Sequence, residues 1–376
     1  MNRAGKTLTV VVLLGLMAGF GVGVNRYLAS RTSRAFDAPN KPTQETIAPK
    51  SALKGIVYFA DDGGLFAIDG TKVIQLQPQG QGWMQPALLP DGSGLLAVKE
   101  TPNLYSDLYE LNLDGTIRAQ LSQDAATSAQ NAIDLSGNNW IFYPTVGPDG
   151  DLYFSYDWPK EPDASNAFQV DFAIWKATMG STIERGNAGK TMTRLSGPDW
   201  YTGGDVSPVP LADGHLLYVK YESANNPDQV STAIPGALAG QEVSQIRLDP
   251  TAATDGTPLT QPAQNCSEPA VSPDETMIAM ICSPSSTEAD LVLASFSVTA
   301  GIGPLTYVVT GTMAAMPTWS PTGTDLLYLA PASGNGYFQL WHISGVNTGI
   351  PLTPKMVTSD LDLDATSAPV WAAGQG

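Results

Sequence analysis

Short apolar stretches separated by turn residues dominate the chain from residue 54 onwards. One phrase recurs: a proline, three residues, a second proline or its substitute, a two-residue turn, and then an apolar stretch. The full phrase begins at Pro86, Pro144, Pro208, Pro269 and Pro317, and a shortened copy begins at Pro369. Proline sets φ at the start of a turn and Asp-Gly tolerates the backbone that follows. Each phrase therefore predicts two strands folded back on each other.

The spacing of the phrases indicates how the strands are grouped. The full copies follow one another after 58, 64, 61 and 48 residues, and the shortened copy follows after 52. A repeat of this length is typical of β-propeller blades. The strands expected after the turns span residues 95–99, 152–156, 215–219, 277–281 and 326–330, and a third strand is expected in most copies, as at 107–112 and 337–343.

The first blade lacks the opening phrase. Residues 55–59, 64–69 and 72–76 supply its outer strands, and the C-terminal segment 368–371 is expected to supply its innermost strand. Joining both ends of the chain in one blade would close the ring and leave no open sheet edge. The fold class expected is therefore all-β, a six-bladed β-propeller spanning residues 54–376, with a single N-terminal transmembrane helix.

The Pro-Asp-Gly phrase with its following strand resembles the TolB-like family of propellers, which are related to WD repeats. Three copies keep Asp-Gly, whereas Asp274-Glu275 and Thr322-Gly323 depart from it. The resemblance covers nearly all of residues 54–376. It implies the fold and the binding of proteins outside the cytoplasm, and it implies no catalytic residues.

The N-terminus carries an uncharged apolar run from Leu8 to Val24. Its 17 residues reach the short limit for a spanning helix, so residues 1–29 are interpreted as a cytoplasmic tip and membrane anchor. A cleaved signal peptide is the alternative. Gly15, Gly19 and Gly23 share one helix face and would let a second copy approach closely, although glycine is also common in membrane helices. Residues 30–53 are expected to form a flexible linker.

The chain has two cysteines, Cys266 and Cys282, which flank the turn at 273–275 almost symmetrically. In a hairpin this places them about opposite each other, within reach of a disulfide. A disulfide favours an oxidising compartment, and two buried free thiols are the alternative. Together with the anchor, the cysteines predict a single-pass membrane protein whose propeller lies outside the cytoplasm.

The charge balance excludes one class of partner. Nineteen Lys and Arg residues oppose 36 Asp and Glu residues, which gives a formal charge of −17. Nucleic-acid affinity comes chiefly from basic side chains at phosphates. A chain this acidic is not expected to bind DNA or RNA.

Catalytic patterns are scarce. The two histidines, His215 and His342, both fall in predicted strands, and no Gly-x-Ser-x-Gly elbow occurs. Asp360, Asp362 and Asp364 alternate with leucines and could hold Ca²⁺, but the helix-loop-helix calcium pattern fails, so a solvated turn is the alternative. No catalytic residue and no obligatory cofactor are expected.

Two long insertions are candidates for a partner surface. One runs from 157 to 168 and contains Trp158; the other runs from 221 to 242 and contains Asn225, Asn226 and Asp228. The function expected is a non-catalytic, protein-binding scaffold in an envelope complex.

Two other functions are kept as alternatives. A metal-dependent hydrolase or lactonase would need acidic residues from several blades at the axis, where the phrases are expected to offer Ala, Val, Leu and Trp. A glycan- or calcium-binding module would rest on Trp158, Trp200, Tyr201 and the Asp360 cluster.

Overall fold

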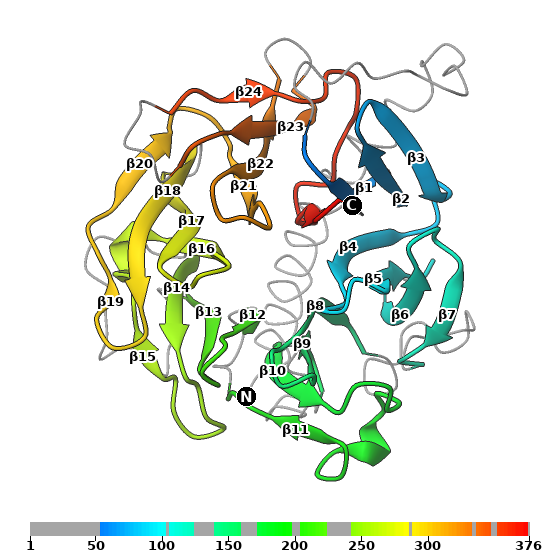
Figure 1. Cartoon of the computed structure of the whole chain (residues 1–376). Helices are drawn as coiled ribbons and strands as arrows, with labels where there is room; N and C mark the ends of the chain where they lie inside the picture. Colours follow the sequence, from blue (N-terminus) through cyan, green and yellow to red (C-terminus); the bar gives the residue numbers. More distant parts are fainter. Residues whose placement is uncertain are drawn as a thin grey trace, which may run out of the picture. The chain divides into compact units, whose positions relative to one another are not determined.

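The computed structural model describes residues 53–102, 105–123, 139–158, 171–197, 204–223, 242–285, 288–332, 336–346 and 352–374. All of them belong to one compact unit, residues 46–376. Their strands form six antiparallel sheets that surround a common axis (Figure 1). This part of the chain is an all-β, six-bladed propeller, as the repeat predicts.

Successive blades follow the chain in order, and each inner strand lies next to the axis (Figure 1). Blade 1 contains β25 (Val370–Ala372), β1 (Ile56–Asp61), β2 (Gly64–Asp69) and β3 (Lys72–Gln77); blade 2 contains β4 (Trp83–Leu88), β5 (Gly94–Glu100), β6 (Ser106–Asn112) and β7 (Ile117–Gln120). Blade 3 contains β8 (Ile141–Val146), β9 (Leu152–Tyr156), β10 (Ala173–Ala177) and β11 (Met192–Arg194); blade 4 contains β12 (Asp205–Pro210), β13 (Leu216–Ser223), β14 (Glu242–Leu248) and β15 (Thr257–Pro258). Blade 5 contains β16 (Cys266–Val271), β17 (Met277–Ser285), β18 (Glu288–Ser297), β19 (Gly301–Ile302) and β20 (Thr306–Val309); blade 6 contains β21 (Ala315–Trp319), β22 (Leu326–Pro331), β23 (Phe338–Ile343) and β24 (Lys355–Met356). In the described part of the chain, the short 3₁₀ helices η2 (Arg185–Asn187) and η4 (Pro262–Gln264) connect strands.

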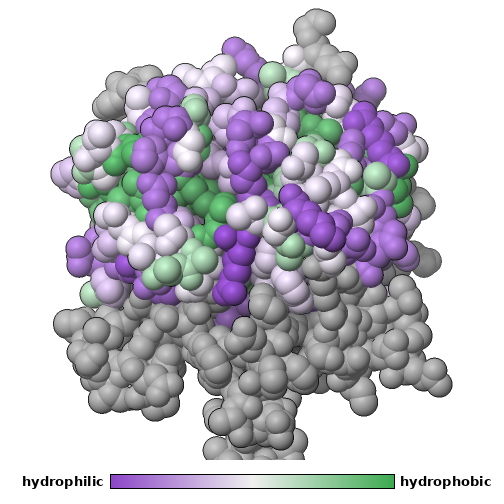
Figure 2. Space-filling model, turned by 90° about the horizontal axis from the view of Figure 1, so that it is seen from below, coloured by the Kyte–Doolittle hydropathy of each residue, from purple (hydrophilic) through white to green (hydrophobic). Residues whose placement is uncertain are grey.

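The hydrophobic core lies between neighbouring blades. Leu96 and Val98 of β5 are fully buried and share one cluster with Phe154 and Trp175 of blade 3. Apolar side chains on both faces of the middle strands explain why these strands read as nearly continuous hydrophobic runs. The side view of the ring in Figure 2 shows hydrophilic residues spread over the surface and separating its hydrophobic patches.

The predicted turns form after the repeat prolines, because glycine in them can adopt a backbone conformation that other residues disfavour. Gly92, Gly150 and Gly214 take positive φ of 68°, 80° and 90°, the left-handed region in which glycine is favoured. Glu275 occupies the same place in blade 5 with φ of 55°, and its carboxylate accepts a hydrogen bond from the backbone N–H of Ala212 at 2.7 Å. That bond to the neighbouring blade helps to offset the strain of a non-glycine residue there.

The two ends of the propeller meet in blade 1. β25 pairs with β1, so that Trp371 lies opposite Val57, and the Trp371 indole N–H donates to the Lys54 carbonyl at 2.7 Å. This is the closure expected from the shortened C-terminal phrase. The structure differs from expectation in blade 5, where β18 pairs with two outer strands, β19 and β20.

A side-chain hydroxyl just beyond the outer strand recurs in four blades, and sequence reasoning did not identify it. Each hydroxyl accepts a hydrogen bond from a backbone N–H of the third strand, as Ser122 does from Leu108 at 2.9 Å. The other three pairs are Ser196 with Ile174, Thr260 with Ile246, and Thr358 with Leu340. These bonds satisfy buried donors where the outer strand ends.

The expected membrane anchor at residues 1–29 and the expected linker at 30–53, apart from Leu53, lie outside the described residues. Leu53 is buried in a hydrophobic cluster with Val57 and Trp371, so it belongs to the propeller. Within the ranges given above, no helix has the length and apolar character needed to cross a membrane.

Candidate functional site

The inner strands share a backbone irregularity at the residue before the repeat proline. Positive φ of about 50° occurs at Gln85, Tyr143, Ser207, Glu268 and Met316, and the strand register shifts at the same places. A residue before proline is normally held in the extended region, so this conformation is strained. Its recurrence in five blades shows that the surrounding ring imposes it.

These five residues line a cavity where the inner strands meet. The cavity has a volume of about 150 Å³, and Ala368 of the sixth position also borders it. Its wall is completed by prolines that follow the strained residues, and by two neighbours: Pro86, Pro144, Pro208, Pro269 and Pro317, with Thr145 and Val209. The repeat therefore places rigid apolar wall and one variable side chain per blade at the axis.

Hydrogen bonds join neighbouring blades around the cavity. Gln85 Oε1 accepts from the backbone N–H of Tyr143 at 2.7 Å, and Glu268 Oε2 accepts from that of Met316 at 2.6 Å. The backbone N–H of Gln85 donates in turn to Ser367 Oγ at 2.7 Å. The side chain of one blade thus holds the strained backbone of the next.

Glu268 is the one charged residue in the described lining of the cavity. Burial raises the pKa of its carboxyl group from 4.5 to about 7, and the N–H of Met316 opposes this rise. The side chain keeps some solvent contact through the cavity, but the surrounding blades leave its charge poorly hydrated. Glu268 therefore changes charge near neutral pH.

Tyr143 contributes aromatic surface to the same cavity. Burial raises the pKa of its hydroxyl far above the ordinary value, with smaller contributions from Tyr221, Glu268 and Asp364. The Tyr143 hydroxyl is consequently neutral at any physiological pH.

Neither histidine belongs to the cavity lining. His215 lies on the exposed side of blade 4, where hydrogen bonding to Asp249 raises the pKa of its imidazole. His342 Nε2 lies 3.1 Å from Asp325 and its ring packs edge-on against Trp371. His342 lies in β23 as predicted, whereas His215 lies in the turn just before β13 and not within the strand expected at 215–219.

The aspartates proposed for calcium take separate partners. Asp360 accepts from the Ser359 hydroxyl and Asp364 accepts from the backbone and hydroxyl of Thr366. The backbone N–H of Asp362 donates to Asp61. Among the described residues, no group of three His, Cys, Asp or Glu side chains is placed to hold a metal ion.

The structure describes only part of the proposed partner surface. The Trp158 ring is partly buried and lies 5.5 Å from that of Trp175, so it contributes to the core of blade 3. The other residues proposed for partner, glycan or membrane contacts fall outside the described ranges: Asn225, Asn226, Asp228, Trp200, Tyr201, Gly15, Gly19 and Gly23.

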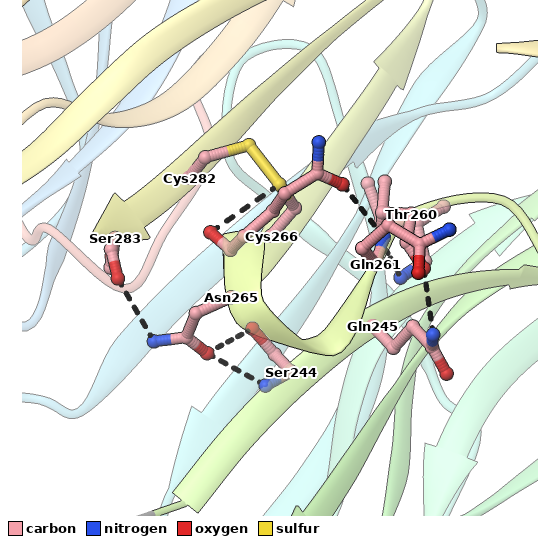
Figure 3. Close-up of a disulfide and its surroundings, with 10 residues drawn as sticks. Ser244, Gln245, Thr260, Gln261, Asn265, Cys266, Cys282 and Ser283 are labelled. Atoms are coloured by element: carbon pink, nitrogen blue, oxygen red, sulfur yellow. Dashed lines mark hydrogen bonds between the residues drawn. A yellow bond between two sulfur atoms is a disulfide. The ribbon is translucent and has the colours of Figure 1, made fainter. Parts of the chain in front are cut away.

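The predicted disulfide is present. Cys266 and Cys282 lie opposite each other on β16 and β17 with Cα atoms 4.0 Å apart. Figure 3 shows the adjacent Asn265, whose side chain accepts from Ser244 and donates to the Ser283 carbonyl. The disulfide ties down the start of β16, two residues before the strained Glu268.

One sequence expectation about the axis was right only in part. The inner strands were expected to offer Ala, Val, Leu and Trp; Val209 and Ala368 do line the cavity, but no described Leu or Trp does, and the residues before the repeat prolines supply most of its other side chains. The repeat proline marks these positions in the sequence. Its ordinary effect on the preceding residue, an extended backbone, gives no indication of the left-handed turn that exposes them to the axis.

Comparison with known proteins defines the fold. No protein-family model matches the chain, and no curated protein matches it significantly in sequence. TolB from Acinetobacter baumannii is similar in structure, with a TM-score of 0.57 and 14% identity over 87% of this chain and 68% of that one. A putative TolB from Agrobacterium tumefaciens has a TM-score of 0.53 and 14% identity over 85% and 94% of the two chains. A gluconolactonase from Xanthomonas campestris, at a TM-score of 0.45 and 11% identity over 86% and 89%, is too distant to inform function. The chain has the TolB-like six-bladed propeller fold.

Proposed function

We propose that this chain is a non-catalytic scaffold that binds a partner protein in a membrane-envelope complex. The composition of the axial cavity carries the proposal. Prolines, Tyr143 and Met316 supply contact surface, and Glu268 has no second acid or histidine beside it in the described lining. A rigid, largely apolar wall with one charged side chain suits recognition, whereas acid–base catalysis uses paired groups whose pKa values are pushed apart.

The proposal places the propeller outside the cytoplasm, held by residues 1–29. The disulfide between Cys266 and Cys282 supports an oxidising compartment. The apolar run from Leu8 to Val24 supports the anchor, and its glycines support pairing of two copies within the membrane. Washing membranes at alkaline pH tests the anchor: the chain should stay with the lipid, and its release would contradict a spanning helix.

Partner binding is tested by cross-linking the full chain in membranes, solubilising in detergent and identifying what is captured. Tyr143→Asn removes the aromatic wall, and asparagine tolerates the left-handed backbone at this position. Tyr307→Asn is the matched control, because Tyr307 is 51% exposed on β20, outside the lining of the axial cavity. A partner that uses the cavity should be lost with Tyr143→Asn and kept with Tyr307→Asn. Equal capture by both variants would contradict the proposed surface.

A hydrolase or lactonase is the second candidate, because a carboxyl pKa near 7 suits a general acid. Glu268 would then be the acid, and Glu268→Gln should abolish turnover of lactone or peptide substrates. Turnover by the wild type that is lost in this variant would replace the scaffold proposal.

A further inference from the structure

Gln85 in blade 2 and Glu268 in blade 5 accept equivalent hydrogen bonds from the next blade, although one side chain is neutral and the other is acidic. Gln85 and Glu268 each accept the backbone N–H of the next blade's strained residue, at 2.7 and 2.6 Å. The Gln85 amide shows that a neutral oxygen is sufficient for this bond. The negative charge at Glu268 is therefore not required to hold the ring together.

That charge is unfavourable where it lies. The lining residues include no lysine or arginine to compensate it. Glu268 Oε2 takes the N–H of Met316, and Oε1 has no hydrogen-bond partner among the residues that the structure describes. Oε1 keeps contact with solvent through the cavity and is open to a donor group on a ligand, and pairing with a cation would offset the cost of burying the rest of the carboxylate.

The surroundings of Glu268 select the kind of ligand. A calcium ion takes six to eight oxygen ligands, and a single carboxylate does not supply them. Proline rings, the Met316 side chain and the Tyr143 ring favour an apolar stem, and an aromatic face attracts a cation. The cavity of about 150 Å³ admits a group the size of one side chain rather than a folded segment.

We propose that the axial cavity binds a single organic cation, an ammonium or guanidinium group on an aliphatic stem, whose charge pairs with Glu268. The open Oε1 accepts from the cation while Oε2 stays on Met316, and Tyr143 and the prolines pack against the stem. That the cation is a Lys or Arg side chain of the partner protein rests on the proposed function. The existence of a cation site in the cavity does not depend on it.

The charged groups near Glu268 do not account for its raised pKa, so the effect of pH on cation binding is expected to come from the ionisation of Glu268 itself. Strands β12, β13, β14, β17 and β21 pack against β16, and neither β17 nor β21 carries a free titratable side chain. The described charged or titratable side chains on the other three strands are Asp205, Tyr218, Lys220, Tyr221 and Arg247. None of them is a cause of the raised pKa of Glu268, which comes from burial. Asp364 acts on the neighbouring Tyr143 and adds to the negative character of the region.

The test measures binding of Nα-acetyl-arginine amide to the full chain in detergent by ligand-observed NMR. Nα-acetyl-citrulline amide, which has the same shape without the charge, is the matched control ligand. The wild type should bind the cation about tenfold more tightly than the neutral analogue, the effect expected of one charge-assisted hydrogen bond. In Glu268→Gln the two ligands should bind equally, while circular dichroism shows the fold intact. Equal binding of both ligands by the wild type, or an unchanged preference in the variant, would overturn the site.

A second measurement keeps the proposal testable if Glu268→Gln fails to fold. The arginine side chain stays charged at every pH used, so pH acts through Glu268. With a pKa of about 7, affinity should rise about tenfold from pH 6 to pH 8. A flat profile would refute the role of the carboxylate.

Failure of this site and failure of the scaffold give different results. Binding of the free cation without any captured partner supports the site and contradicts the scaffold. A partner captured equally by wild type and Glu268→Gln, with no preference for the cation, supports the scaffold and overturns the site.

Discussion

Replacing Glu268 with glutamine should stabilise the propeller above neutral pH. Gln85 shows that an amide oxygen can accept the same inter-blade N–H, so the bond to Met316 is retained. The carboxyl pKa is about 7 in the folded protein against 4.5 for the free side chain. The folded state therefore binds more protons than the unfolded state between these values, and its stability falls as pH rises through this window.

The size of the effect follows from the same two values. Ionisation of Glu268 lowers the free energy of unfolding by about 1 kcal/mol at pH 5 and about 3 kcal/mol at pH 8. The loss does not grow further once pH exceeds the folded pKa. Because the Glu268 side chain keeps partial solvent contact, these reductions in the free energy of unfolding are upper limits. Glutamine does not ionise, so the variant does not lose this stability at any pH.

Urea denaturation of wild type and Glu268→Gln from pH 5 to pH 8 measures this difference. Tryptophan fluorescence reports unfolding, because the chain has eight tryptophans and Trp83 is fully buried. The difference between the two proteins cancels the contributions of the other acidic residues. The variant should gain stability relative to wild type as pH rises. A difference that is constant with pH would refute the assignment of a buried, ionising carboxylate at the axis.

Three further predictions concern the ring. Replacing Cys266 and Cys282 with serine should lower the free energy of unfolding by about 3 kcal/mol, because the disulfide links residues 16 positions apart. Reductant should not change the stability of this variant, and equal stability of the wild type and the variant would contradict a stabilising disulfide. Trp371→Ala should lower the free energy of unfolding, measured by chemical denaturation, by about 3–5 kcal/mol, because the ring is buried opposite Val57 where blade 1 closes. A decrease below about 1 kcal/mol would show that ring closure depends little on β25. Gly214→Ala should cost about 1 kcal/mol through its positive φ alone, because no atom lies within 4 Å of the added methyl group; thermal unfolding with no shift would show that the turn relaxes.

Much of the fold could be predicted because turn chemistry is local. Pro and Asp-Gly set backbone angles within a few residues, so the hairpins after Pro86, Pro144 and Pro208 follow from the sequence. The disulfide could be predicted for the same reason, since a hairpin fixes which residues face each other. The extra strand β20 could not, because its pairing with β18 depends on a chain reversal without a comparable signal.

The axial site depended on tertiary structure. Nothing near Gln85, Tyr143 or Glu268 in the sequence indicates a left-handed residue before proline, and local preference opposes it. The conformation persists because the inner strands crowd one axis, and the side chains of Gln85 and Glu268 each accept the backbone N–H of the strained residue in the next blade. The raised pKa of Glu268 has the same origin, because burial among several blades is a property of the assembled ring.

By itself, the sequence determined the repeat unit, its six-fold count, the meeting of the two chain ends and the cysteine pairing, because short-range backbone geometry and regular spacing encode them. Only the tertiary structure decided which side chain of each blade faces the axis and how strongly its charge is desolvated. Those properties arise where residues about 50 to 60 positions apart come together, and no local pattern specifies them.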